Sequence, residues 1–231
     1  MQPTAIDAFK LVMSTSARPE APGQTETNTR LRFSVAQALA QGRISFHVQP
    51  IVRAGNTRFP AFYECLARLR MPDGRVLPAG AFMPAVESGA IGRAVDRLAL
   101  SHALTTLAAA PGLRLSINMS PLSMGDEHWL AILDDARLRH PGACDRLIVE
   151  ITEANTLHDI GQTIDFMDHV RAAGCAFALD DFGAGATGFK YFRDFRFDIV
   201  KIDGAFVRGV AGNRDAPVSY THLTLPTILL V

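Results

Sequence analysis

Short apolar runs alternate along this chain with longer segments whose apolar residues recur at helical spacing. The apolar runs lie at 44–52, 59–70, 114–118, 146–153, 175–182 and 197–203, and the helical segments at 31–41, 91–109, 127–140, 159–173 and about 186–194. Apolar runs of this length, bounded by turn residues, are typical of strands that are buried on both faces. Strands that alternate with helices predict an α/β fold with a parallel sheet and crossover helices.

Polar side chains stand where these predicted strands end. Five of the runs finish on a residue that can hold a cation or an anion, namely Glu64, Asn118, Glu150, Asp180 and Lys201. A βα-barrel builds its active site from side chains at the carboxyl ends of its strands. One polar strand end is a weak indication, but several within a βα repeat predict one shared site.

The adjacent pair Asp180 and Asp181 is the most informative of these strand ends. Two carboxylates at the end of a buried strand repel each other and lose hydration. A hard divalent cation such as Mg²⁺ relieves both costs, because it takes oxygen ligands and keeps water sites for a phosphate substrate. For an isolated pair, a solvated Asp-Asp turn is an equally good interpretation.

Each of the other residues also has a structural interpretation. Asn118 stands before Met119-Ser120-Pro121 and could be a turn residue. Glu150 and Glu153 could be acids at the start of a helix, and Lys201 could form an ordinary ion pair with a neighbouring aspartate. Taken singly, these interpretations are favoured, but the ordered combination favours a site.

Composition narrows the class of protein. The 231 residues are 48% hydrophobic and 20% charged, which is enough for one large domain or most of a barrel. Lys plus Arg and Asp plus Glu are both 23, so a nucleic-acid polymer or a polybasic membrane contact is not expected. Three cysteines at no metal-ligand spacing are typical of a reducing cytoplasm, and Cys65 is expected to face the core. No run is long enough to span a membrane.

The chain divides into three expected parts. Residues 1–30 are expected to be a disordered leader, because 14–30 are rich in Ser, Thr, Pro, Gly and charge. Residues 31–212 form the expected domain. Residues 213–231 follow it as a tail that ends in an apolar run.

Several ordered motifs in residues 31–210 resemble those of the EAL domain family of cyclic di-GMP phosphodiesterases. The family motif Glu-Ala-Leu reads Glu64-Cys65-Leu66 here and is followed by Arg68. The other matching motifs are FHVQPIV with Gln49, PAGAFMPAVESG, INMSP, EITE, DDFG and KID, in family order.

The resemblance implies a modified TIM-type βα-barrel that hydrolyses cyclic di-GMP to linear pGpG with two Mg²⁺ or Mn²⁺ ions. By motif, Asp181 would hold the second metal and Lys201 would contact the attacking water. Glu153 would support the site. The substrate would be contacted by Gln49 and Arg68, and the first metal would be held by Glu64, Asn118, Glu150 and Asp180.

The chain departs from the family pattern in two places. The family's loop after DDFG, which links the second metal to dimerisation, differs here in sequence. The resemblance still implies a homodimer through the loop after Asp181. The family's last two strand-helix units are not recognisable, so we expect an incomplete barrel from a truncated gene or with a foreign tail. The strands at 44–52 and 197–202 would then keep unpaired edges, with Pro226 keeping the last apolar run out of a regular central strand. Low solubility and negligible hydrolysis would follow.

Two other functions stay open. A non-catalytic cyclic di-GMP receptor or protein-interaction module is one, although degenerate members of the family typically lose the metal carboxylates that are present here. An unrelated magnesium barrel with a lysine base is the other, and it leaves Gln49, Glu64 and Arg68 unexplained.

Overall fold

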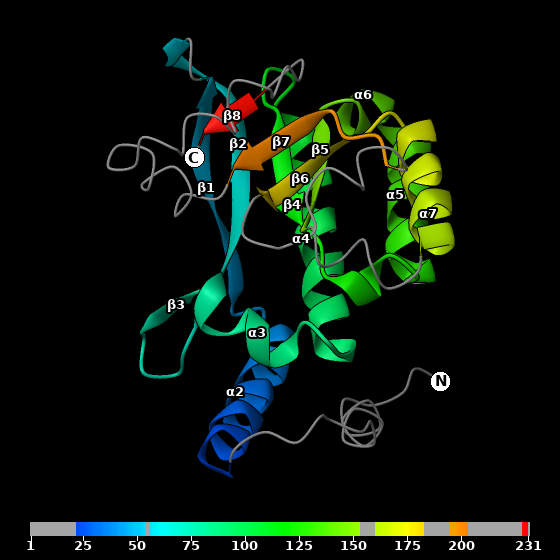
Figure 1. The fold of residues 1–231 in the computed structure, drawn as a ribbon. Coiled ribbons are helices and arrows are strands. Elements are labelled where there is room, and N and C mark those ends of the chain that lie inside the picture. Colours follow the sequence, from blue (N-terminus) through cyan, green and yellow to red (C-terminus); the bar gives the residue numbers. More distant parts are fainter. Residues whose placement is uncertain (1–21, 54–55, 153–159, 183–194, 203–227, 231) are drawn as a thin grey trace, which may run out of the picture.

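The computed structural model describes residues 22–53, 56–152, 160–182, 195–202 and 228–230 (Figure 1). Within these ranges one eight-stranded sheet runs in the order β1-β2-β4-β5-β6-β7-β8, with β3 pairing with β2 beside this path. The sheet curls so that β8 comes back beside β1 (Figure 1). The architecture is an incomplete, TIM-like α/β barrel.

The first two strands form a long antiparallel hairpin. β1 (Ile44–Arg53) and β2 (Asn56–Arg70) pair so that Gln49 lies opposite Glu64, and β3 (Val76–Pro78) adds antiparallel to the end of β2. The expectation of a purely parallel sheet is therefore wrong for this region. Only residues 54–55 separate β1 from β2, and a parallel crossover needs a dozen or more residues.

The remaining strands pair in parallel as the alternating pattern predicts. They are β4 (Leu115–Asn118), β5 (Leu147–Thr152), β6 (Ala176–Phe182) and β7 (Ile199–Ile202), and β4 also pairs in parallel with β2. The predicted helices at 91–109, 127–140 and 159–173 are confirmed as α4 (Ala90–Ala109), α5 (Glu127–Arg139) and α7 (Ile160–Ala172). These helices lie outside the sheet (Figure 1). The carboxyl ends of β2 and β4–β7 therefore meet at one end of the barrel.

Short turns of helix join these elements. Among the described residues they are two 3₁₀ turns, Ala79–Ala81 and Pro121–Ser123, and two four-residue helices, α3 (Met83–Val86) and α6 (Pro141–Cys144). The helix predicted at about 186–194 lies outside the described residues. In the part of the chain that the structure describes, no helix is long and apolar enough to cross a membrane.

The N-terminal helix is longer than the sequence pattern indicates. α2 spans Pro22–Ala40, whereas the pattern predicts a helix only from 31 and disorder up to 30. For residues 22–30 the prediction of disorder is wrong; residues 1–21 lie outside the described residues. A proline is well tolerated in the first turn of a helix, and the buried side chains of Val35 and Ala38 anchor α2 to a core that also includes Val86 of α3.

The last described strand corrects a second expectation. β8 (Ile228–Leu230) pairs in parallel with β7, with Val200 opposite Ile228. The prediction that β7 keeps an unpaired edge is therefore wrong. The pairing begins two positions after Pro226, so it does not use the proline. β8 lies beside β1 without a hydrogen-bonded ladder between them in the described ranges.

Two apolar layers fix the barrel. The outer face of the sheet packs against α4, α5 and α7 through buried side chains that include Leu100, Leu107, Ile117, Trp129, Val149, Phe166 and Phe177. The inner face carries a smaller cluster of Ile51, Phe62, Ile148, Ala178 and Ile199. Side chains two residues apart on a strand share a face. The next inward-facing positions after this cluster are therefore those of Glu64, Glu150, Asp180 and Lys201.

Candidate active site

Three carboxylates and one ammonium group meet directly above the inner apolar cluster. Lys201 Nζ lies 2.6 Å from Glu150 Oε2, 3.1 Å from Glu64 Oε2 and 3.2 Å from Asp180 Oδ1. These four side chains come from β2, β5, β6 and β7, whose carboxyl ends lie at one end of the barrel. We call Glu64, Glu150, Asp180 and Lys201 the strand-end cluster.

Three of the four side chains of the strand-end cluster are buried, Asp180 is partly buried, and the cluster carries an excess of negative charge. Glu150 is 1% exposed, Lys201 3% and Glu64 7%. Three carboxylates against one ammonium leave a formal charge of minus two. Glu150 Oε1 is buried without a hydrogen-bond partner among the described residues, and an orphaned buried acceptor is costly unless a ligand completes it.

Burial and mutual charge shift the titration of these groups. Burial raises the pKa of Glu150, with Lys201 opposing this shift and Glu64 and Asp180 adding to it. Burial alone would lower the pKa of Lys201, but the nearby carboxylates of Glu150, Asp180 and Glu64 raise it above its ordinary value. Lys201 is therefore held as an ammonium that donates hydrogen bonds.

Asn118 completes the edge of the cluster from β4. Its Nδ2 donates a hydrogen bond to Glu64 Oε1 at 2.9 Å, and its side chain reaches the exposed mouth of the barrel. Asn118 and Glu150 are also paired neighbours in the ladder between β4 and β5. The amide therefore fixes one oxygen of Glu64 while Lys201 fixes the other.

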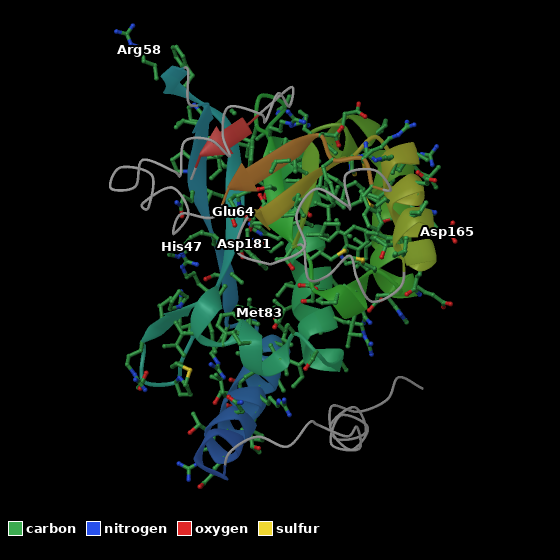
Figure 2. All side chains as sticks on the ribbon, viewed as in Figure 1. His47, Arg58, Glu64, Met83, Asp165 and Asp181 are labelled. Carbon is green, nitrogen blue, oxygen red and sulfur yellow. The ribbon has the colours of Figure 1, made fainter. Side chains whose placement is uncertain are left out.

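The Asp180-Asp181 pair forms a β-bulge. The ladder between β6 and β7 pairs Leu179 with Val200 and then Phe182 with Ile202, so the two aspartates lie opposite the single residue Lys201. Asp181 has a φ of 55°, a left-handed conformation that aspartate tolerates better than most residues. Bulges re-aim side chains beside active sites, and Figure 2 shows Asp181 at the same end of the sheet as Glu64.

The donor set suits a divalent cation. Glu64, Glu150 and Asp180 each present an oxygen, and these atoms lie within 4.8 Å of one another. Hard cations such as Mg²⁺ and Mn²⁺ prefer carboxylate and amide oxygens. The charge of minus two and the orphaned oxygen of Glu150 agree with this chemistry. Asp181 is not part of the three-carboxylate group.

The two predicted substrate contacts lie on the same face of the β1–β2 hairpin. Gln49 is exposed and directly opposite Glu64, so the two side chains share a face. Arg68 stands four residues beyond Glu64 on β2, which is about 13 Å along the strand at ~3.3 Å per residue. It is half-buried and donates from Nη1 to Ala67 O. Neither side chain contacts a carboxylate of the cluster through any described interaction.

Two other sequence predictions have different outcomes. Glu153 lies outside the described residues, so its supporting role stays a prediction. Cys65 is confirmed as a core residue, because it is buried against the outer helices, and burial, followed by the charge of Glu64, raises the pKa of its thiol to about 11.

Sequence reasoning missed Asp96, a buried aspartate near the start of α4. Its Oδ2 accepts hydrogen bonds from Ser120 N at 2.9 Å and Ser123 Oγ at 2.6 Å. The available signal was one acid on the otherwise apolar stripe of the helix, between Val95 and Ala99.

The fold and the strand-end cluster are those of a TIM-like barrel enzyme. Comparison with known proteins identifies the family within this class. The EAL domain family matches residues 33–223, so the chain belongs to the EAL domain family. The match extends beyond the predicted domain boundary at 212.

Curated relatives carry related names. The chain is 26% identical over 181 residues to the cyclic di-GMP phosphodiesterase PdeF of Escherichia coli. The aligned region covers 77% of this chain and 24% of that protein. It is 30% identical over 185 residues to the cyclic di-GMP phosphodiesterase PdeB of Shewanella oneidensis, covering 78% and 21%. The chain thus spans about a quarter of the length of these relatives.

Solved structures share the fold. The PaMucR phosphodiesterase in its c-di-GMP complex has a TM-score of 0.73 and 24% identity, covering 82% of this chain and 78% of that one. The EAL enzyme Bd1971, with cAMP and cyclic di-GMP bound, has a TM-score of 0.77 and 22% identity, covering 87% and 57%.

Proposed function

We propose that this chain is a metal-dependent phosphodiesterase that hydrolyses cyclic di-GMP to linear pGpG in second-messenger signalling. The observation that carries the proposal is the strand-end cluster, in which two buried carboxylates and the partly buried Asp180 share one lysine, and Glu150 Oε1 has no partner among the described residues. The names of the curated relatives support the choice of substrate.

The residues have distinct proposed roles. Glu64, Asn118, Glu150 and Asp180 would hold a first Mg²⁺ or Mn²⁺ ion, and Asp181 a second. Bound cations of this kind lower the pKa of water and stabilise the attacking and leaving oxygens of a phosphodiester.

Lys201 would act as a hydrogen-bond donor. Its Nζ donates hydrogen bonds to Glu64 and Glu150 and pairs with Asp180, and these carboxylates raise its pKa above the ordinary lysine value. A protonated lysine cannot accept the proton of an attacking water. It would therefore orient that water and offset negative charge, while Glu153, which lies outside the described residues, would support the site.

The substrate would lie along the hairpin from the cluster outward. Cyclic di-GMP is an anionic dinucleotide, and a guanidinium such as that of Arg68 binds a phosphate or stacks on a base. The Gln49 amide, directly opposite Glu64, can donate and accept hydrogen bonds. The two side chains would hold the two ends of one ligand.

A direct assay tests this function. The purified chain is incubated with cyclic di-GMP and Mg²⁺ or Mn²⁺, with chelator as the control, and the products are separated by chromatography. The expectation of negligible hydrolysis rested on two unpaired strand edges, and the pairing of β7 with β8 removes one of them. We therefore expect pGpG from this chain, and only when the metal is present. Lys201→Ala should slow turnover more than it weakens binding measured by calorimetry. Binding of cyclic di-GMP without cleavage would support the receptor alternative instead.

Two further proposals concern the setting of this activity. We place the reaction in the cytoplasm, supported by three described cysteines that are all free thiols, and light microscopy of a fluorescent fusion would test it.

We also propose a homodimer through the loop after Asp181, whose residues 183–194 lie outside the described ranges. Light scattering with and without the metal would reveal the dimer, and a monomer under both conditions would exclude it.

A further inference from the structure

Asp96 is a buried carboxylate that the proposed reaction does not use. It is 4% exposed, and no basic group forms an ion pair with it in the described residues. Its Oδ2 accepts from the backbone amide of Ser120 and the hydroxyl of Ser123. Burying an unpaired carboxylate is expensive, so its presence calls for a reason.

The two serines belong to the loop that follows Asn118. Ser120 is two residues after Asn118, and Ser123 ends the 3₁₀ turn Pro121–Ser123. Met119, which lies between Asn118 and Ser120, donates from its backbone amide to Glu150 O of β5 at 3.0 Å. This loop is therefore held by β5 on one side and by the Asp96 side chain of α4 on the other.

The position of Asn118 depends on this double attachment. Asn118 is the last residue of β4 and carries the only described hydrogen bond from an amide side chain to the strand-end cluster. A shift of the loop by a fraction of an ångström would move its Nδ2 away from Glu64 Oε1.

We propose that Asp96 is a positioning residue that fixes the loop after β4 and thereby holds Asn118 at Glu64, setting the cation affinity of the site. The inference rests on the proposed function. It adds a residue on the outer helix α4 to a site built from inward-facing strand residues. Partners of metal ligands typically change metal affinity or activity by about 10–100-fold when they are lost.

A nearby aspartate provides a matched control. Asp126 is 5% exposed, and its carboxylate caps α5 and pairs with Arg97. It makes no described contact with β4 or with the strand-end cluster. If the role of Asp96 were merely structural, replacing Asp96 and replacing Asp126 would have the same effect on the Mn²⁺ affinity of the site.

The experiment compares Asp96→Ala, Asp96→Asn, Ser123→Ala and Asp126→Ala in the whole chain. Calorimetry with MnCl₂ alone gives the Mn²⁺ dissociation constant, and thermal unfolding gives Tm. We expect Mn²⁺ binding about tenfold weaker or more in Asp96→Ala, partly rescued in Asp96→Asn, whose amide oxygen still accepts hydrogen bonds. Ser123→Ala should show a smaller loss. Asp126→Ala should lower Tm and keep the wild-type dissociation constant.

The possible outcomes separate the two proposals. Wild-type Mn²⁺ affinity in Asp96→Ala, as in the control Asp126→Ala, would make Asp96 a structural residue and overturn the inference. If Asp96→Ala does not fold, unchanged affinity in both Asp96→Asn and Ser123→Ala would overturn it equally. If the wild-type chain itself binds no Mn²⁺, the proposed function fails first, and the role of Asp96 fails with it. A fall in kcat at constant KM in Asp96→Asn would support the proposal.

Discussion

Two acidic regions of this molecule, the strand-end cluster and the cap of α5, are built in opposite ways. The strand-end cluster places three carboxylates around one lysine, and Glu150 Oε1 has no described partner. The α5 cap places one carboxylate, Asp126, among several donors. Arg97 Nη2 lies 2.6 Å and Arg93 Nε 3.6 Å from its Oδ2, and the backbone amides of His128 and Trp129 donate to its Oδ1 at 3.0 and 3.1 Å.

The difference separates a site that needs a ligand from one that is complete. At the α5 cap, burial alone would raise the pKa of Asp126, but its hydrogen bonds to Arg97 and the amide of Trp129 hold it below its ordinary value. At the strand-end cluster, burial raises the pKa of Glu150 in spite of Lys201. A perturbed carboxylate alone therefore does not identify a site. What differs between these two regions is that Asp126 has donors on both oxygens, whereas Glu150 Oε1 has none among the described residues.

The largest effect expected from this comparison concerns catalysis. Loss of a partner of a metal ligand costs about 10–100-fold, so loss of a ligand itself through Asp180→Asn or Glu64→Gln should reduce kcat by at least about 100-fold. Asp126→Asn should leave kcat close to that of the wild type. Chromatographic assays of cyclic di-GMP cleavage measure both. Undiminished cleavage by Asp180→Asn would refute the assignment of the cluster.

The second effect concerns stability and the metal. Lys201→Ala leaves the buried Glu64 and Glu150 and the partly buried Asp180 without their cation, and removing one partner of a buried pair costs about 3–5 kcal/mol. A ligand that binds only the folded state raises its stability, so Mn²⁺ should raise the Tm of this variant more than that of the wild type. Arg97→Ala, at the other carboxylate group, should show no such metal response. Equal Tm shifts for wild type and Lys201→Ala would contradict the charge argument.

The third effect is a pH dependence of the free energy of unfolding, to which Asp96 and Asp126 contribute with opposite signs. Burial, opposed by the hydrogen bonds from Ser123 and Ser120 and increased by Glu87, raises the pKa of Asp96 from 3.8 to about 6. The folded state then binds this proton more tightly than the unfolded state, so the contribution of Asp96 to the free energy of unfolding falls as pH rises from about 4 to 6. A shift of about two units corresponds to at most about 3 kcal/mol.

Urea unfolding of wild type and Asp96→Asn at pH 4 and pH 7 isolates this contribution. Groups common to both proteins cancel in the difference between them. We expect the wild type to lose stability relative to Asp96→Asn as the pH rises. A difference that does not depend on pH would show that Asp96 titrates normally.

Much of this architecture is predictable from the sequence, because period-two alternation encodes the barrel interior. Phe62 and Glu64, Ile148 and Glu150, and Ile199 and Lys201 are each two residues apart, so an apolar layer and then a polar layer follow along β2, β5 and β7. Parallel strands then bring the polar members to one end. The sequence therefore predicts which side chains converge, although their roles as ligands remain predictions.

Features that depend on pairing between distant segments were not predictable. The bulge at Asp180 and Asp181 appears only when β6 is aligned with Lys201 of β7. The start of α2 at Pro22 reflects packing of its later turns against α3, which outweighs a polar first turn. Asp96 looked like one acid in a long helix, because its partners Ser120 and Ser123 follow it by 24 and 27 residues.

The smallest effect lies at the complete carboxylate group. Asp126→Asn keeps an efficient helix cap, since Asn and Asp are similar at this position, but it loses the ion pair with Arg97, whose side chain is 33% exposed. We expect a loss of about 1 kcal/mol at pH 7. Because the pKa of Asp126 is lowered in the folded state, its contribution is present above the unfolded value of 3.8 and is lost as the pH falls below it. The deficit of Asp126→Asn should therefore shrink in acid, whereas the pH dependence introduced by Asp96 runs the other way. Urea unfolding at pH 7 and pH 3.5 measures the difference in free energy of unfolding between wild type and Asp126→Asn. A difference that grows in acid would show that the hydrogen bonds and ion pair of Asp126 do not stabilise its ionised form.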